Sequence, residues 1–232
     1  MDGVLVIDKP SGPTSFDVVR RIRSLLRVKK AGHTGTLDPI ATGVLPVCLN
    51  RATKIAGFIA EGQKAYEAVI HLGVETDTHD AAGKTLAAAP VPRLSAERLE
   101  GILSRFRGAL LQTPPMYSAV KIDGKRLYEL ARAGEEVPRA PRPVTVYELA
   151  MRDFSASEVH LFLRCSKGFF VRVLAHELGR ALGCGAHLRS LRRTASGAFT
   201  EGQALKLDRV MSLCSSAGGR VEIERQLISI PD

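Results

Sequence analysis

The loop from residue 32 to residue 46, GHTGTLDPIATGVLP, constrains this chain more than any other segment. It carries one carboxylate, Asp38, among three glycines and two prolines. Glycine lets the backbone adopt positive φ or approach another backbone closely, and proline fixes φ, so the loop is predicted to have a defined shape. Rigidly held loops often present catalytic side chains, although an Asp-Pro pair taken alone is more often a turn. Asp38 is therefore a candidate catalytic residue, with a turn cap as the alternative.

The net charge favours a polyanionic partner, although clusters of like charge are usually only solvated faces. The chain has 33 Lys and Arg residues against 24 Asp and Glu, a formal charge of +9. Positive charge beside phosphates releases counterions and adds affinity that does not depend on nucleic-acid sequence. An anionic membrane surface is the alternative, but apolar residues at helical spacing among the basic ones predict a face that packs on a core. The basic residues form two clusters: Arg20, Arg21, Arg23, Arg27, Lys29 and Lys30, and Arg189, Arg192 and Arg193.

The length and composition predict a globular protein. A chain of 232 residues with 45% hydrophobic residues can build one sizeable core and a small appendage. No apolar run approaches the roughly 20 residues that span a bilayer, and the first residues lack the basic start of a signal peptide. We therefore expect a cytoplasmic protein that does not bind membranes.

No spacing in the chain predicts a metal site or a bound cofactor. The four cysteines are widely separated and contain no CxxC pair, which favours reduced thiols. His176 and Glu177 begin like the zinc motif HExxH, but the fifth position is Arg180. The sequence also lacks a GxxxxGK[ST] phosphate loop and a GxGxxG turn between a strand and a helix. We expect neither metal nor cofactor.

Hydrophobic periodicity and turn residues predict an α+β fold. Strands and helices are intermixed without the regular alternation of a doubly wound sheet, so we expect a mixed, largely antiparallel central sheet flanked by helices. The predicted strands cover residues 4–7, 44–49, 66–72, 144–150, 159–165 and 186–193, and the predicted helices cover 14–27, 52–60, 95–105, 125–133, 170–182 and 207–213.

Five segments in one order resemble the motifs of the TruB family of tRNA pseudouridine synthases. The resemblance spans about residues 2–205. In that family the aspartate of the GHTGTLD motif is the catalytic residue, and here it corresponds to Asp38. The matching segments are residues 3–15, 32–46, 64–83, 112–121, and 165–172 together with 185–193.

The resemblance implies a fold and a function. It implies the pseudouridine-synthase core as a catalytic domain over residues 1–205, with 206–232 as a short extension, a truncated or vestigial PUA-like region. It also implies an RNA-modifying isomerase that converts uridine 55 in the T loop of tRNA to pseudouridine. Such a reaction oxidises nothing and uses neither guide RNA nor cofactor. The implied partner is the T stem-loop of tRNA, with no protein partner required, and we expect a monomer.

The resemblance implies roles for three residues at the reaction centre. A carboxylate at Asp38 could attack as a nucleophile or stabilise positive charge that develops on the sugar. Arg172 matches the active-site arginine, whose guanidinium would pair with Asp38 and keep it ionised. Tyr66 matches the tyrosine that lies against the target base. Without the motifs, such an arginine is more often a surface residue and such a tyrosine more often a sheet residue.

Four further residues complete the implied substrate-binding set. His33 matches the histidine that contacts RNA near the flipped nucleotide, although a lone loop histidine carries no such meaning. Asp80 is expected to contact the uracil edge, and Leu191 to line the base pocket. Phe170 departs from the family, in which many members have tyrosine at that position. Its ring keeps a stacking face, while a hydroxyl hydrogen bond is lost.

Three other interpretations compete with this one. A tRNA chaperone without catalysis would explain the positive charge, but the complete set of Asp38, Tyr66 and Arg172 argues against a chaperone alone. A metal-independent hydrolase would need a second carboxylate of suitable pKa, and the motifs offer none. A guide-dependent relative would be expected to carry a full PUA domain, which the chain length disfavours.

Overall fold

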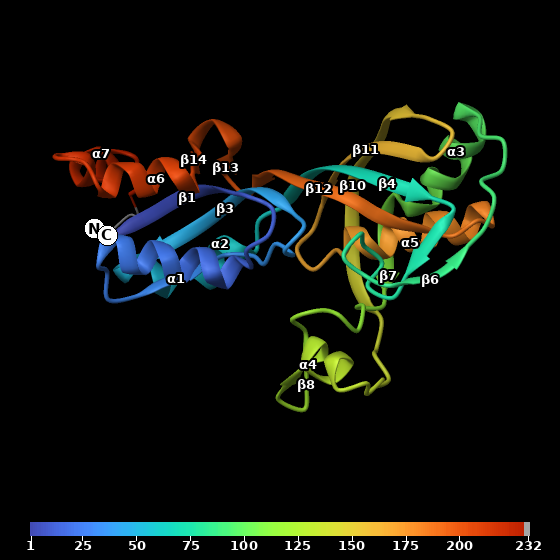
Figure 1. Cartoon of the computed structure of the whole chain (residues 1–232), viewed down its shortest axis with the longest axis horizontal. Coiled ribbons are helices and arrows are strands. Elements are labelled where there is room, and N and C mark those ends of the chain that lie inside the picture. The colour runs from blue at the N-terminus through green and yellow to red at the C-terminus, as the bar shows by residue number, and fades with distance from the viewer. Residues whose placement is uncertain (230–232) are drawn as a thin grey trace. The chain divides into compact units, whose positions relative to one another are not determined.

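The computed structural model describes residues 1–229 and shows a mixed α/β fold built on one large sheet (Figure 1). Hydrogen bonds join its strands in the order β14-β1-β3-β12-β4-β11-β10-β7, with β13 paired to β12 and β2 paired to β3. Because most neighbours are antiparallel and β14 and β12 add parallel pairs, the predicted α+β class with a mixed sheet is confirmed. The chain forms two compact units, residues 67–191 and the remainder on both sides of them.

The helices and strands have the following bounds. The first unit contains β1 (Gly3–Lys9), α1 (Ser15–Leu26), β2 (Ala31–His33), β3 (Thr42–Leu49), a 3-10 helix (Asn50–Ile55), α2 (Ala56–Ala60), β13 (Phe199–Thr200), a 3-10 turn (Glu201–Gln203), β14 (Leu205–Lys206), α6 (Leu207–Cys214) and α7 (Gly219–Arg225). The second contains β5 (Val74–Thr76), β6 (Thr85–Ala88), α3 (Ala96–Leu103), a 3-10 turn (Ser104–Phe106), β7 (Gly108–Gln112), β8 (Lys121–Ile122), β9 (Lys125–Arg126), α4 (Leu127–Arg132), β10 (Arg142–Phe154), β11 (Glu158–Cys165) and α5 (Val171–Leu182). The chain passes between the units along β4 (Lys64–Leu72) and β12 (Ala186–Ser196).

Strands β1 and β3 form the centre of the first unit. They pair antiparallel along their length, from Gly3 opposite Leu49 to Lys9 opposite Gly43. The C-terminal helices α6 and α7 (red in Figure 1) lie beside β1 (blue), and β14 pairs with β1 in parallel. Nearly every position of both strands is buried, so this part of the sheet lies inside the apolar core. One cluster of this core comprises Val4, Val6, Val44, Cys48, Ala52 and Phe199.

Helix α1 follows the sequence signals closely. Thr14 caps it, because the Thr14 hydroxyl accepts a hydrogen bond from the Asp17 N–H and the Asp17 carboxylate accepts one from the Thr14 N–H. The helix ends at Arg27, which adopts the left-handed conformation with φ 50°. Its buried apolar residues recur at helical spacing, so the opposite face is left to the basic side chains. The buried apolar residues are Val18, Val19, Ile22 and Leu26.

The second unit is built by β10, which pairs antiparallel with both β11 and β7. Helix α5 has one buried apolar side and ends at Gly183, whose φ of 80° suits glycine. Gly179 of α5 lies against β12, where an added Cβ would come 2.2 Å from the Ala186 nitrogen. The hairpin of β8 and β9 and the helix α4 form a small projection in Figure 1.

Some segments differ from the sequence prediction. The helix predicted over 52–60 begins as a 3-10 helix and becomes α-helical only from Ala56. The Thr53 hydroxyl donates to the Asn50 carbonyl at 2.7 Å, which competes with a regular helical ladder. The sequence does not predict β7 or α7, since turn-forming residues precede α7 and most of β7 is exposed. The boundary after residue 205 stays a prediction.

Within residues 1–229, no helix is long and apolar enough to cross a membrane.

Candidate active site

The side chain of Lys9 holds the loop around Asp38 by hydrogen bonds to its backbone. This side chain is fully buried, and Nζ donates to the carbonyls of Pro10 at 2.9 Å, Pro39 at 3.3 Å and Ala41 at 2.8 Å. A buried ammonium satisfied by three carbonyls is rare, because lysine seldom leaves water without partners. Two of the three carbonyls belong to the loop, so Lys9 fixes the backbone on both sides of Ile40.

Arg193 is a second buried cation under the same loop. Nε donates to the Val44 carbonyl at 2.7 Å and Nη2 to the Gly35 carbonyl at 3.0 Å, so one guanidinium joins both ends of the loop. Gly43 is required here, because it has φ 98° and an added Cβ would come 2.3 Å from the Arg193 carbonyl oxygen. The basic cluster of Arg189, Arg192 and Arg193 does not form one surface, since the Arg193 side chain is buried.

Helix α1 provides the third support for the loop. The Ser15 hydroxyl donates to the Leu37 carbonyl at 3.0 Å and accepts from the Leu37 N–H at 2.8 Å. The Gly12 N–H donates to the Pro39 carbonyl at 2.8 Å, and the Ala41 N–H donates to the Asp38 carbonyl at 3.0 Å. The backbone on either side of Asp38 is thus fixed, and the prediction of a loop with a defined shape is confirmed.

Burial sets the electrostatics of this loop. It lowers the pKa of Lys9 from 10.5 to about 8, while the Asp38 charge raises that pKa and the Arg193 charge lowers it. Burial, and then the Arg193 charge, also lowers the pKa of His33. The His33 Nδ1 accepts a hydrogen bond from the Gly35 N–H at 3.3 Å. Lys9 therefore stays mainly protonated at pH 7, whereas His33 is mainly neutral.

Tyr66 lies on β4 in the same unit as Asp38 and His33. It is buried, with 7% of its surface exposed. A tyrosine that is buried in a strand keeps its ring orientation fixed by its neighbours.

The second unit holds Arg172 and Asp80 together. Arg172 is on the first turn of α5 and is 3% exposed. Its Nη1 donates to the Thr78 carbonyl at 2.9 Å and its Nη2 to the Tyr117 carbonyl at 2.8 Å, while Nε lies 3.7 Å from Asp80 Oδ2. Asp80 Oδ1 accepts from the Thr78 hydroxyl at 2.6 Å. Arg172 is therefore held by the turn between β5 and β6 and by the Tyr117 carbonyl, and Asp80 is held within that turn.

Two stacked histidines attach the same turn to α5. The rings of His79 and His176 are parallel within 7°, and their centroids are 4.1 Å apart. Burial, followed by the charges of His176 and Arg172, lowers the pKa of His79 to about 4. His176 Nδ1 lies 3.2 Å from a Glu75 carboxylate oxygen. The turn thus meets α5 at Arg172 and again one helical turn later.

Phe170 and Leu191 complete the predicted set. Phe170 is the residue before α5 and is half-buried, whereas Leu191 lies on β12 and is buried. The structure thus places Asp38, His33 and Tyr66 in the first unit, and it places Asp80, Phe170, Arg172 and Leu191 in the second. Of the second set, it brings Asp80 and Arg172 into direct contact.

Sequence reasoning missed the residues that hold these side chains in place. Lys9 lies in a matched motif, yet lysine is rarely buried, and Arg193 is grouped in the sequence with the basic residues Arg189 and Arg192. Tyr117 acts through its backbone carbonyl, which no side-chain pattern reveals. Across the part of the chain that the structure describes, no group of three or more His, Cys, Asp or Glu side chains is placed to hold a metal ion.

Comparison with protein families identifies the chain. The TruB family pseudouridylate synthase N-terminal domain matches residues 23–171, and the tRNA pseudouridylate synthase B C-terminal domain matches residues 172–228. The chain belongs to the TruB family. It is 48% identical over 214 residues to the tRNA pseudouridine synthase B of Francisella philomiragia, covering 92% of this chain and 71% of that protein. It is 51% identical to the one of Azoarcus sp., covering 90% and 69%.

The fold of the chain also matches solved structures. The chain is similar to one described as a Cbf5-Nop10-Gar1 complex, with a TM-score of 0.72 and 32% identity. That match covers 91% of this chain and 54% of the other. A second, an archaeal box H/ACA sRNP Nop10-Cbf5 complex, has a TM-score of 0.70 and 29% identity and covers 97% and 58%. The chain thus spans little more than half the length of these solved relatives.

Proposed function

We propose that this TruB-family chain converts uridine 55 in the T loop of tRNA to pseudouridine, without a guide RNA or a cofactor. Asp38 is the catalytic carboxylate. The observation that carries the proposal is the Asp38 loop, which two buried cations hold in one shape, in a chain about half identical to named tRNA pseudouridine synthases. A single carboxylate fixed in this way is what a pre-organised catalytic group requires.

The chemistry needs only groups that the chain supplies. In the reaction the bond between the sugar C1′ and the uracil N1 breaks, a bond from C1′ to C5 forms, and the C5 proton is lost while N1 gains one. No electrons are exchanged with another molecule, so no redox cofactor takes part. A carboxylate can serve as a nucleophile or stabilise charge on the sugar, and Asp38 fills either role.

The remaining residues of the set bind the target nucleotide. A uridine inside a folded loop must be extruded before its glycosidic bond can be reached, at a cost of a few kcal/mol. Aromatic faces offset about 1–3 kcal/mol per stacked base, and we assign this role to Tyr66 and Phe170. Arg172, Asp80, His33 and Leu191 complete the substrate-binding set.

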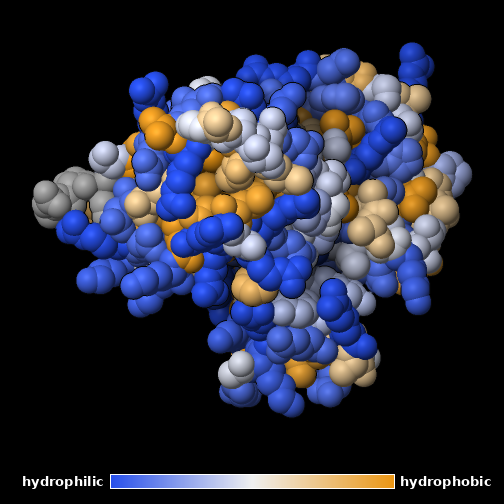
Figure 2. Space-filling model, turned by 60° about the vertical axis from the view of Figure 1, so that its left-hand side comes forward, coloured by the Kyte–Doolittle hydropathy of each residue, from blue (hydrophilic) through white to orange (hydrophobic). Residues whose placement is uncertain are grey.

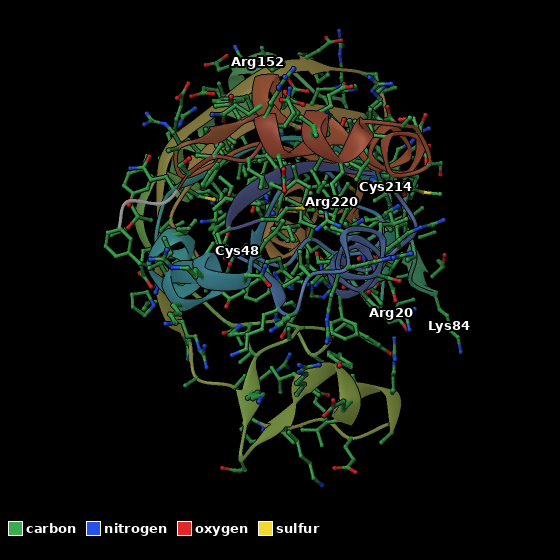
Figure 3. All side chains as sticks on the ribbon, turned by 90° about the vertical axis from the view of Figure 1, so that its left-hand side faces the viewer. Arg20, Cys48, Lys84, Arg152, Cys214 and Arg220 are labelled. Atoms are coloured by element: carbon green, nitrogen blue, oxygen red, sulfur yellow. The ribbon has the colours of Figure 1, made fainter. Side chains whose placement is uncertain are left out.

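Helix α1 offers a surface that suits the RNA backbone. Phe16, Arg20, Arg23 and Arg27 follow each other at intervals of four, three and four residues, and all are exposed. This spacing places Phe16, Arg20 and Arg23 on one helical face, and Arg27 is the residue at which the helix ends. Figure 3 shows Arg20 extending from α1, and hydrophilic side chains cover much of the face seen in Figure 2. Arginines beside an exposed aromatic ring fit phosphates and a base.

We expect the protein to act as a monomer in the cytoplasm.

The test is incubation of the purified chain with an unmodified tRNA transcript, followed by carbodiimide treatment and primer extension. We expect a single new stop, at uridine 55. A transcript with cytidine at that position is the matched control and should give none. A stop at another uridine would overturn the assigned position, and the absence of any stop would overturn the activity.

A further inference from the structure

The side chain of Gln112 forms both hydrogen bonds of a strand neighbour with the backbone of Phe170. Its Oε1 accepts from the Phe170 N–H at 2.7 Å, and its Nε2 donates to the Phe170 carbonyl at 3.1 Å. A side-chain amide carries one acceptor and one donor group, so it can satisfy both backbone groups of a single residue. Gln112 itself lies at the end of β7, where its backbone pairs with Arg142 of β10.

Phe170 occupies the position where the chain enters α5. It is the N-terminal cap of the helix, with φ −104° and ψ 106°, and its side chain contributes no capping hydrogen bond. Its carbonyl accepts the first helical bonds, from Val173 at 3.1 Å and Leu174 at 3.3 Å. Most helices begin with a polar residue that satisfies free N–H groups, and phenylalanine cannot do so. The start of α5 therefore has no capping side chain of its own, and the Gln112 side chain holds it by hydrogen bonds to the Phe170 backbone.

The segment that begins at Gln112 also holds Arg172. Five residues further along, the Tyr117 carbonyl accepts from Arg172 Nη2 at 2.8 Å. The same segment therefore holds Phe170 through a side chain and Arg172 through a backbone carbonyl. Phe170 and Arg172, both assigned to substrate binding at the start of α5, thus depend on the segment at the end of β7.

We propose that Gln112 is a positioning residue that sets the Phe170 ring and the Arg172 guanidinium by fixing the start of α5. This role rests on the proposed function, in which both residues bind the target nucleotide. Gln112 acts through Phe170 and has no assigned contact with substrate. Its loss should therefore lower turnover more than RNA affinity, since most phosphate contacts are made elsewhere.

The first experiment compares Gln112→Met with the wild type. Methionine preserves the length of the side chain and removes both hydrogen bonds. We expect a 10- to 100-fold lower single-turnover rate on tRNA transcript, because small displacements of positioned groups have effects of about this size. We expect the tRNA Kd to change less than three-fold. The matched control is Gln226→Ala at an exposed glutamine, which should leave both values unchanged. A Kd change as large as the rate change would refute a positioning role.

The second experiment does not depend on activity. The chain has no tryptophan, so Phe170→Trp introduces a single fluorescent reporter at the position in question. We expect Gln112→Met to lower the anisotropy of Trp emission and to increase its quenching by acrylamide, with Gln226→Ala as the control. An unchanged reporter in the Gln112→Met background would overturn the proposal. If the wild type makes no pseudouridine but the reporter responds, the proposed function fails while the structural link stands.

Rescue distinguishes positioning from general stability. Gln112→Glu keeps the acceptor for the Phe170 N–H and loses the donor to its carbonyl. We expect its single-turnover rate to lie between those of the wild type and Gln112→Met at pH 7.5, with melting temperatures alike in both variants. A rate for Gln112→Glu below that of Gln112→Met would show that the hydrogen bond from the Phe170 N–H does not contribute to turnover, and it would contradict the positioning role.

Discussion

Asp38 is the residue whose charge the proposed chemistry needs most. Asparagine keeps the shape of the side chain and removes both the negative charge and the nucleophile. We predict that Asp38→Asn forms no product, while its tRNA affinity stays within a few-fold because the binding charge lies elsewhere. Single-turnover assays and filter binding measure the two quantities. A variant that converts transcript at a near wild-type rate would remove Asp38 from the reaction.

Tyr66 and Phe170 separate stacking from hydroxyl chemistry. Because residue 170 is already phenylalanine, Tyr66 alone of the two offers a phenol. We predict that Tyr66→Phe slows turnover strongly with a modest loss of binding, that Phe170→Tyr has almost no effect, and that Phe170→Ala impairs both steps. Single-turnover rates and binding constants of the three variants test this. If Tyr66→Phe were as fast as the wild type, Tyr66 would act only as a stacking surface.

The buried ammonium of Lys9 makes stability depend on pH in a defined direction. Its pKa is about 8 in the folded protein and about 10.5 when unfolded, so the unfolded state binds more protons between these values. Stability therefore rises with pH across this window. We predict that the wild type gains up to about 3 kcal/mol relative to Lys9→Met between pH 8 and pH 10.5. Urea unfolding at the two pH values measures the difference, and a constant difference would contradict the pKa of Lys9.

At the scale of elements, α1 combines a buried apolar face with a basic outer face. Within residues 1–229, Arg21 and Arg23 form no ion pair, and Arg20 pairs only with Asp17 at 3.3 Å. We predict that neutralising Arg20, Arg21 and Arg23 together lowers the slope of log affinity against log salt by about 2–3 and leaves the modified position unchanged. The charge-matched control neutralises the exposed Arg93, Arg98 and Arg105. Equal slopes for the two variants would show that Arg20, Arg21 and Arg23 do not bind RNA.

Helix α5 can lie close to β12 only because Gly179 has no side chain. Alanine normally stabilises a helix interior by about 1 kcal/mol relative to glycine. Here an added Cβ would come 2.2 Å from the Ala186 nitrogen, so we predict that Gly179→Ala lowers the free energy of unfolding by about 1–3 kcal/mol. The control is Gly101→Ala in α3, where a Cβ meets no atom within 4 Å and should stabilise. A stable Gly179→Ala variant would mean that α5 shifts without cost.

At the scale of the molecule, the two compact units do not follow the order of the chain. The first unit combines the N-terminal 66 residues with the segment from Arg192 onward, and β14 near residue 205 pairs with β1. A boundary sought along the sequence looks for one linker, whereas here β4 and β12 both carry the chain between units. Sequence composition could not reveal this arrangement, because strands leave no signal for the strand with which they will pair.

The sequence by itself determined what depends on local order. The cap of α1, the continuous apolar runs of β1 and β3 and the glycine end of α5 depend on neighbouring residues, and their predicted positions are confirmed to within a few residues. The family motifs are also runs of neighbouring residues, so the resemblance to the family can be recognised from the sequence alone. Tertiary structure alone decided the partners of Lys9, Arg193 and Gln112. Apart from the Lys9 bond to Pro10, their hydrogen bonds join residues 30 to 158 positions apart and end mostly on backbone carbonyls, which every residue has. Because every residue has a backbone carbonyl, the sequence does not indicate which carbonyls will accept these hydrogen bonds. Only the folded chain shows which groups hold the site.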